Sequence, residues 1–208
     1  MQVTGDLYDR LAPFYDLMSR SLLFPFGGDT RFRKQVVEAW NIQRDDRVLE
    51  LGCGTGLMTR LLVDRGASVT AVDRSPPMLA RARKRAPEAT FVEHDAVDFI
   101  PPREFDRVVL SYVLHELDAR SRATVLARAR VALVTGGMIG IVDFDDSARQ
   151  PLRTLIDLYL RVAEPPSARE WASHGFGTEL PAAGLTLATS SAIGWGTARV
   201  GLCVPSAR

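Results

Sequence analysis

The sequence predicts a single α/β domain built on a doubly wound, mainly parallel sheet with helices on both faces. Three observations lead to this fold class. Short apolar runs typical of buried strands alternate with longer segments of helical periodicity, as in successive βαβ units. The 208 residues are enough for one domain with a sizeable core. A glycine-rich loop also joins the first apolar run to a helical run, where parallel sheets bind ligands.

Seven strand-like runs follow one another along the chain. Helical segments lie between most of the first five runs, and this alternation indicates a mainly parallel sheet. The last two runs are joined by a short connection around Gly194 and Gly196, which indicates an antiparallel pair. The expected strands are residues 47–50, 68–73, 90–93, 106–111, 138–142, 185–191 and 197–204.

Helices are expected between these runs. One begins at Leu57, and Pro77 suits the first turn of the next, at 77–86. A helix at 121–134 is expected to end at Gly136 and Gly137, ahead of the fifth strand. The last helix, at 152–163, is expected to end before a proline pair, with a loop at 171–176.

Composition narrows the classes of protein. The net charge of +1 does not favour a nucleic-acid partner. Cys53 and Cys203 are far apart and give no disulfide framework, which favours a reducing cytoplasm. We find neither a signal-peptide pattern nor an apolar run of about 20 residues, the length that spans a bilayer. We therefore expect a cytoplasmic protein with at most peripheral membrane contact.

The glycine loop ELGCGTG, residues 50–56, is the most informative stretch. Its glycines allow a tight turn and close approach to a ligand, and the next helix offers free N–H groups. A dinucleotide-binding fingerprint would place its third glycine at Leu57. Glu50 at the strand tip would repel a diphosphate but attract a cationic group. The loop therefore favours an α-amino acid over a pyrophosphate.

Two further acids follow strands. Asp73 ends the second run, about twenty residues past the glycines, where an acid binds both hydroxyls of a ribose. Asp95, after the third run, could place a carboxylate near an adenine amino group. An amino acid, a ribose and an adenine together make up S-adenosylmethionine (SAM).

At these motifs the chain resembles the class I SAM-dependent methyltransferases over roughly residues 45–145. The matching stretches are ELGCGTG, AVDRSPPML, EHDA, FDRVVLSYVLHEL and TGGMIGIVDF. The resemblance implies a Rossmann-like, seven-stranded sheet with an antiparallel terminal strand, SAM as cofactor, and methyl transfer by in-line displacement. The predicted cofactor-binding residues of these stretches are Glu50, Gly52, Cys53, Gly54, Gly56, Asp73, Arg74, Met78, Asp95, Ala96 and Ser111.

Residues 1–40 precede the first core strand and are predicted to form a helical lid, with the methyltransferase domain at 41–208. Residues 8–18 resemble the opening of the ubiquinone/menaquinone C-methyltransferases and related phospholipid N-methyltransferases. This resemblance implies that Tyr8 and Tyr15 border the cofactor. The apolar spacing leaves three interpretations open: packing on the core, a lid over cofactor and acceptor, or membrane contact through residues 1–26.

The sequence identifies the residues around the methyl acceptor less specifically than those around the cofactor. Quinone C-methyltransferases carry an Arg–Asn pair shortly after the fourth strand, whereas this chain has His115 and Glu116. We predict these two as catalytic residues, with His115 as a base where the acceptor must lose a proton. The alternative is that His115 caps or packs the helix after the strand. His174 either lines an acceptor pocket or lies on plain surface. The expected acceptor is a small or lipid-like molecule: a quinol, a phenol or an amine.

The sequence also bears on other functions. A non-catalytic SAM-binding protein remains an alternative, and a nicotinamide-dependent oxidoreductase is disfavoured by Leu57 and Glu50. A nucleic-acid methyltransferase is disfavoured because its Asn-Pro-Pro-Tyr-like or Pro-Cys motifs are missing from the sequence.

No metal is expected, because the acids at 143, 145 and 146 are predicted to form a solvent-facing loop. The basic run at 81–85 is predicted to form a solvated helix face.

Overall fold

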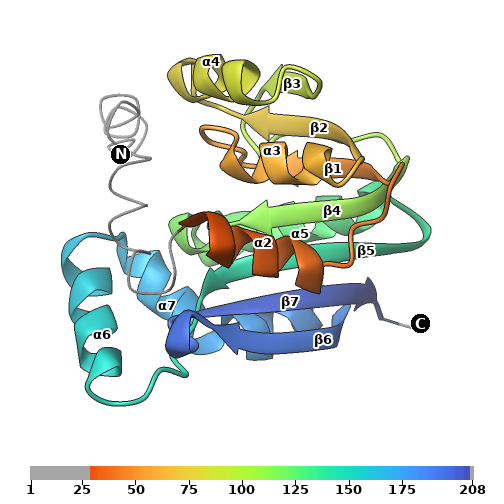
Figure 1. The fold of residues 1–208 in the computed structure, drawn as a ribbon. Helices are drawn as coiled ribbons and strands as arrows, with labels where there is room; N and C mark the ends of the chain where they lie inside the picture. Colours follow the sequence, from red (N-terminus) through yellow and green to blue (C-terminus); the bar gives the residue numbers. More distant parts are fainter. Residues whose placement is uncertain (1–28, 207–208) are drawn as a thin grey trace. The chain divides into compact units, whose positions relative to one another are not determined.

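The computed structural model describes residues 29–206, which form two compact units drawn in Figure 1. The first unit ends at Phe99 and the second begins at Ile100. Tyr8, Tyr15 and most of the predicted lid lie outside the described residues. Within the described residues, none of the helices has the length and apolarity needed to cross a membrane.

The first unit is a parallel three-stranded arrangement in the order β3-β2-β1. The four residues of β1 that follow Arg47 are all buried, as expected for a parallel strand that is covered on both faces. The elements are α2 Asp29–Ala39, β1 Arg47–Leu51, α3 Leu57–Asp64, β2 Ser68–Asp73, α4 Pro76–Arg85 and β3 Thr90–Glu93.

Local sequence accounts for the helices of this unit. Ser75 caps α4 by accepting a hydrogen bond from the Met78 backbone N–H, and prolines occupy its first turn. The helix α2 buries Phe32, Val36 and Val37 and contacts α3. The part of the predicted lid that the structure describes is thus a packed helix, and the predicted boundary at residue 40 stays a prediction.

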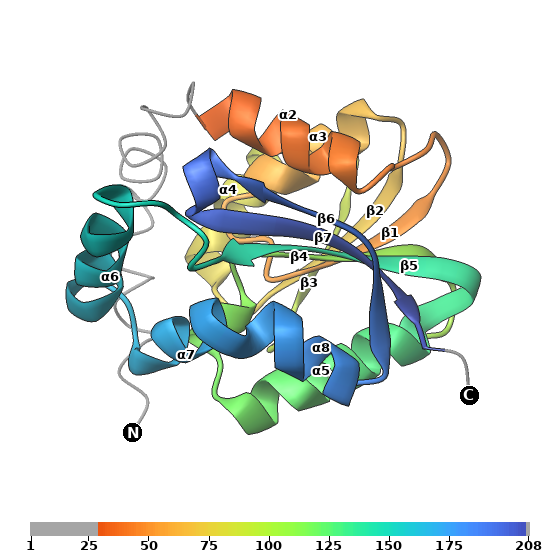
Figure 2. The ribbon, with the colours of Figure 1, turned by 90° about the horizontal axis from the view of Figure 1, so that it is seen from below.

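The second unit has four strands in the order β4-β5-β7-β6. Strands β4 and β5 are parallel, whereas β7 is antiparallel to both β5 and β6. Figure 2 shows α5, α7 and α8 along one face of these strands. The elements are β4 Phe105–Ser111, the 3₁₀ turn η2 Leu114–Glu116, α5 Ala119–Ala132, β5 Leu133–Phe144, α6 Leu152–Val162, α7 Pro166–His174, the π-helical η3 Gly175–Glu179, α8 Leu180–Ala182, β6 Leu185–Ile193, the 3₁₀ turn η4 Gly194–Gly196 and β7 Ala198–Pro205.

Most predicted elements are confirmed within a few residues, including the antiparallel pair at the C-terminus. The predicted loop at 171–176 is wrong, because these residues belong to α7 and η3. Pro166 sits in the first turn of α7, a position that proline favours. One face of the helix buries Ala168, Trp171 and Ala172, whose spacing is helical.

The start of β5 is a second difference. The helix α5 ends at Ala132, and Gly136 and Gly137 lie inside the strand rather than between helix and strand. The register with β4 shifts between Phe105 and Arg107, which pair with Leu133 and Met138. The glycines therefore fall in an irregular stretch of β5, where Gly136 has a positive φ of 82°.

Candidate active site

The glycine loop connects β1 to α3 in the first unit. The N–H groups of Gly52 and Cys53 both donate to the Val72 carbonyl, which ties the loop to the end of β2. At Gly56, with φ of 78°, a Cβ would lie 2.8 Å from the Ala82 Cα, so α4 packs too closely for any side chain. At Gly54, with φ of 52°, a Cβ would meet nothing within 4 Å, so this backbone borders open space. The loop is thus packed on one side and open on another.

Asp73 holds the loop from the end of β2. Its Oδ2 accepts a hydrogen bond of 2.7 Å from the Gly54 N–H, and its Oδ1 accepts one of 2.9 Å from the Ser75 N–H. Burial raises the pKa of this carboxyl, although the backbone donors of Ser75 and Gly54 oppose the shift. A carboxylate has about four lone-pair sites, so Asp73 keeps acceptor capacity for two ribose hydroxyls.

Glu50 is buried, with 1% of its surface exposed. Its Oε2 accepts a hydrogen bond of 2.6 Å from the Thr59 hydroxyl. Burial raises the pKa of Glu50 to about 8, against the opposing effects of Thr59 and Arg33. A cationic group brought beside this carboxyl would lower its pKa and restore the charge. The residue therefore fits an ammonium group better than a phosphate.

The remaining predicted cofactor residues of this unit have distinct settings. Asp95 accepts a hydrogen bond of 2.8 Å from the Val97 N–H and lies 3.6 Å from Arg74. Met78 is buried on α4, Ala96 is half-buried, and Cys53 is buried with a raised thiol pKa caused by burial. A neutral, buried thiol indicates that Cys53 packs within the loop.

Sequence reasoning missed one residue at this loop. Arg85 was predicted on a solvated helix face, but its Nη1 donates to the carbonyl and hydroxyl oxygens of Thr55, at 2.5 and 2.9 Å. The prediction was wrong because the last turn of α4 carries Arg85 back to the loop. Arg85 therefore supports the loop from α4, as Asp73 does from β2.

In the second unit, Ser111 ends β4 and Tyr112 follows with a positive φ of 57°. A non-glycine residue in this region is uncommon and marks a constrained backbone. The Ser111 hydroxyl oxygen is buried and has no hydrogen-bond partner among the described residues. An unsatisfied buried hydroxyl at the carboxyl end of a strand is consistent with a polar ligand. Its predicted cofactor contact stays a prediction.

His115 lies in η2 at the centre of a buried charge cluster. Its Nδ1 is 2.6 Å from Asp143 Oδ1, and its Nε2 is 3.6 Å from Glu164 Oε2. Glu164 also accepts a hydrogen bond of 2.7 Å from the Tyr159 hydroxyl. We call Asp143, His115, Glu164 and Tyr159 the His115 cluster.

The charge state of His115 bears on its predicted role as a base. Burial acts to lower its pKa, but the carboxylates of Asp143, Glu164 and Glu116 together outweigh burial and raise the pKa to about 10. His115 is therefore an imidazolium at neutral pH and has no free lone pair to accept a proton. This observation favours the alternative interpretation, in which His115 packs and bonds after β4. Glu116, half-buried in the same turn, stays a predicted catalytic residue.

Two of the three acids predicted in a solvent-facing loop are buried, whereas Asp146 is exposed as predicted. Asp143 is 1% exposed and accepts hydrogen bonds from the backbone N–H groups of Leu114, His115 and Phe144. Asp145 is 6% exposed and bonds to Ser147 and, at 3.1 Å, to Arg199. The prediction was wrong for Asp143 and Asp145, because partners distant in sequence compensate their charges. No cluster of three or more His, Cys, Asp or Glu side chains within residues 29–206 could hold a metal ion.

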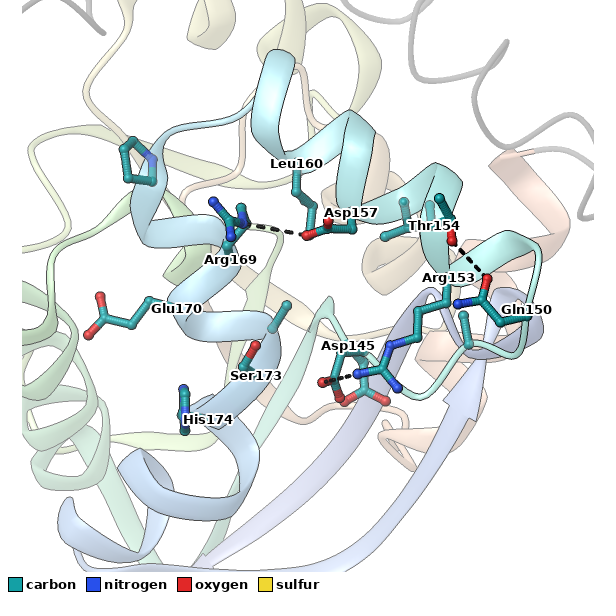
Figure 3. Close-up of a pocket in the computed structure, with 15 residues that line it drawn as sticks. Asp145, Gln150, Arg153, Thr154, Asp157, Leu160, Arg169, Glu170, Ser173 and His174 are labelled. Carbon is teal, nitrogen blue, oxygen red and sulfur yellow. Dashed lines mark hydrogen bonds and ion pairs between the residues drawn. The ribbon is translucent and has the colours of Figure 1, made fainter.

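A cavity of about 700 Å³ lies between α6, α7 and the segment that follows β5 (Figure 3). Charged side chains on its walls are largely paired: Arg169 lies 3.5 Å from Asp157, and Arg153 lies 3.4 Å from Asp146. Leu160 and Ala172 add apolar wall. His174, exposed at the end of α7, lines this cavity. Its size is that of a small-molecule site.

The chain is similar to known proteins in sequence and fold. A family described as "Methyltransferase domain" matches residues 48–137. An uncharacterised methyltransferase of Synechocystis sp. is 30% identical over 174 residues, which cover 83% of this chain and 82% of that protein. A demethylmenaquinone methyltransferase of Renibacterium salmoninarum is 30% identical over 169 residues, which cover 81% of this chain and 70% of that protein. The chain belongs to the SAM-dependent methyltransferase family.

The fold of this methyltransferase agrees with a solved relative. The DhpI–SAH complex aligns with a TM-score of 0.71 at 24% identity, over 98% of this chain and 95% of that one. The predicted fold class is confirmed: seven strands, mostly parallel, with one antiparallel terminal strand. SAM as cofactor and methyl transfer as the enzymatic activity are confirmed as well. The roles of individual site residues stay predictions.

The structure differs from the site prediction mainly around His115, the predicted catalytic histidine. The structure brings together the glycine loop and Asp73, and it adds Arg85 to them. It also joins His115 to Glu164 and Tyr159, which sequence reasoning did not single out. Glu164 stands before a proline pair and 49 residues after His115, so no local spacing marks the two as partners.

Proposed function

We propose that this methyltransferase transfers the methyl group of SAM to a small-molecule or lipid-like acceptor, a quinol, a phenol or an amine, by in-line displacement. The observation that carries this acceptor class is the cavity between α6, α7 and the segment that follows β5. Its volume of about 700 Å³ suits one small molecule, and its walls combine apolar and polar groups. A demethylmenaquinone methyltransferase among the relatives supports a quinol within this class.

The cofactor side of the proposal rests on the residues of the first unit. Asp73 accepts the ribose hydroxyls, Glu50 compensates the positive charge of the amino-acid head group, and Gly54 lets the backbone approach it. Asp95 faces the adenine, with Arg74 beside it. When bound, SAM supplies a methyl group already activated by a sulfonium. The protein then contributes mainly proximity and alignment, which can be worth about 7–11 kcal/mol.

One surface feature supports the lipid-like part of the acceptor class. The helix α6 exposes Leu155, Leu158 and Val162, which are 60, 57 and 79% exposed. Their spacing places them on one side of the helix. Arg161 is also exposed on this helix and pairs with Asp157 at 2.8 Å. An exposed apolar side of a helix suits contact with a bilayer, from which a lipid-like acceptor would be collected. The predicted membrane contact of residues 1–26 lies outside the described residues.

Sedimentation with anionic vesicles tests this surface. Leu158→Ser should reduce the bound fraction by about twofold or more, because it removes apolar area at the centre of the stripe. Val131→Ser is the matched control, since Val131 is 61% exposed on α5. Equal binding of both variants and the wild type would remove the membrane from the proposal and leave the cavity as its basis.

A methyl-transfer assay tests the function itself. Calorimetric titration with SAM, S-adenosylhomocysteine and NAD comes first, and binding of the first two without NAD is expected. Transfer of labelled methyl from SAM is then measured with a quinol, a phenol and an amino-lipid as separate acceptors. Turnover of one of them supports the proposal. Tight SAM binding without turnover of any acceptor class would favour the non-catalytic alternative.

A further inference from the structure

Glu164 lies in the segment between α6 and α7 and forms an ion pair with His115 of η2. We propose that Glu164 is a positioning residue, which pairs with His115 and thereby fixes α6 and α7 as the walls of the acceptor cavity. This inference rests on the proposed function for the meaning of the cavity. It assigns no contact between Glu164 and the acceptor.

His115 is itself held in place by several contacts. Asp143 accepts hydrogen bonds from two backbone N–H groups of η2, at 3.0 Å from Leu114 and 3.2 Å from His115. The same carboxylate lies 2.6 Å from the ring nitrogen Nδ1. His115 is 4% exposed, and Phe144 packs at 4.8 Å between ring centroids. The imidazole therefore has little freedom to turn.

Glu164 reaches this fixed group from the other side. Its Oε2 lies 3.6 Å from His115 Nε2, and its Oε1 accepts the 2.7 Å hydrogen bond from Tyr159 of α6. Ser167 of α7 donates a bond of 2.7 Å to the His115 carbonyl. Two polar contacts thus reach His115, from Glu164 and from Ser167 of α7, and the Tyr159 bond ties α6 to Glu164.

These contacts are also linked to the cavity. Phe144, Leu160, Ala168 and Ala172 form an apolar cluster, with Tyr159 packed against it. Leu160 and Ala172 also line the cavity. A shift of α6 or α7 would therefore change the cavity and the apolar cluster together.

The charges around His115 indicate that the Glu164–His115 contact fixes the position of these residues and adds little to the stability of the fold. The imidazolium of His115 faces the carboxylates of Asp143 on β5 and Glu164 between α6 and α7, and Glu116 of its own turn adds a further negative charge. A buried ion cluster gives little net stability, because desolvation opposes the attraction. Its geometry is nevertheless specific, since a displaced partner leaves a buried charge unpaired.

The test compares Glu164→Gln, Glu164→Asp and Tyr159→Phe with Glu38→Gln, a control at an exposed glutamate of α2. Hydrogen exchange of residues 152–174 is measured in the full chain. Glu164→Gln should speed exchange there by about fivefold or more, while Glu164→Asp restores part of the protection. The pKa of His115, followed by NMR of its ring, should fall in Glu164→Gln. SAM affinity should stay unchanged in all four variants.

A kinetic measurement separates this inference from the proposed function. With a reduced naphthoquinone as acceptor probe, Glu164→Gln should raise KM by about fivefold or more and change kcat less. If the wild type turns over no acceptor, the proposed function fails, and exchange and NMR still decide the positioning role. Unchanged exchange and unchanged His115 pKa in both Glu164→Gln and Tyr159→Phe would overturn the inference. Should Glu164→Gln fail to fold, Tyr159→Phe gives the same readouts.

Discussion

The glycine loop of the first unit and the His115 cluster of the second hold their polar groups in different ways. At the loop, backbone N–H groups donate these hydrogen bonds: Asp73 accepts from Gly54 and Ser75, and the Val72 carbonyl accepts from Gly52 and Cys53. At the cluster, one imidazolium is compensated by two carboxylates in a buried setting. The loop depends on backbone conformation, whereas the cluster depends on charge. The two regions should therefore respond to different substitutions and to pH in different ways.

The largest effect is expected at the cluster. Asp143→Asn should lower the free energy of unfolding by about 3–5 kcal/mol, because it leaves the buried His115 imidazolium without its nearest counter-charge. Urea unfolding measures the change. Asp146→Asn serves as the control, since that side chain is 48% exposed and its effect should stay within about 0.5 kcal/mol. Equal losses in the two variants would show that the cluster does not depend on charge.

The next largest effect is expected at the loop. Gly56→Ala should destabilise the protein by about 2–4 kcal/mol, since it combines a left-handed backbone with a Cβ 2.8 Å from Ala82. SAM binding should weaken at the same time. Gly177→Ala is the matched control, because a Cβ there meets nothing within 4 Å. A neutral Gly56→Ala in urea unfolding would mean that α4 can move away from the loop.

The third prediction concerns the affinity for SAM, which should depend on Asp73 beside the glycine loop. Asp73→Ala should weaken SAM binding about tenfold or more, because a hydrogen bond to a charged group is worth about 1.5–3 kcal/mol. The substitution also removes the acceptor that holds Gly54, so both losses act in the same direction. Calorimetry measures the affinity, with the exposed Asp64→Ala as control. Full SAM affinity in Asp73→Ala would remove the ribose assignment.

The last prediction concerns pH and belongs to the cluster alone. The folded pKa of His115 is raised from 6.5 to about 10, so its contribution to stability is full below about pH 6.5. That contribution declines as pH rises and is lost above about pH 10. The difference in unfolding free energy between the wild type and His115→Gln should therefore shrink from pH 6 to pH 10. A difference that grows with pH would indicate a neutral His115 and return it to the role of a base.

Local sequence was enough to predict much of the fold and the cofactor. A strand, a glycine loop and a helix occupy consecutive residues from Arg47 to Asp64, and the acid that serves the loop follows within twenty residues of Gly54. Periodicity and glycine spacing are properties of neighbouring residues, so they can be read along the chain. The seven strands and the antiparallel pair at the C-terminus were predicted for the same reason.

Only the tertiary structure decided the surroundings of His115. It buried Asp143 and brought Glu164 to His115. These contacts join partners that lie 28 and 49 residues apart along the chain. The sequence does not show whether water or an imidazolium surrounds the carboxylate of an Asp or Glu. The pKa and role of that carboxylate follow from its surroundings. The sequence by itself therefore determined the cofactor and the fold class, while three-dimensional packing determined which acids and which histidine act together.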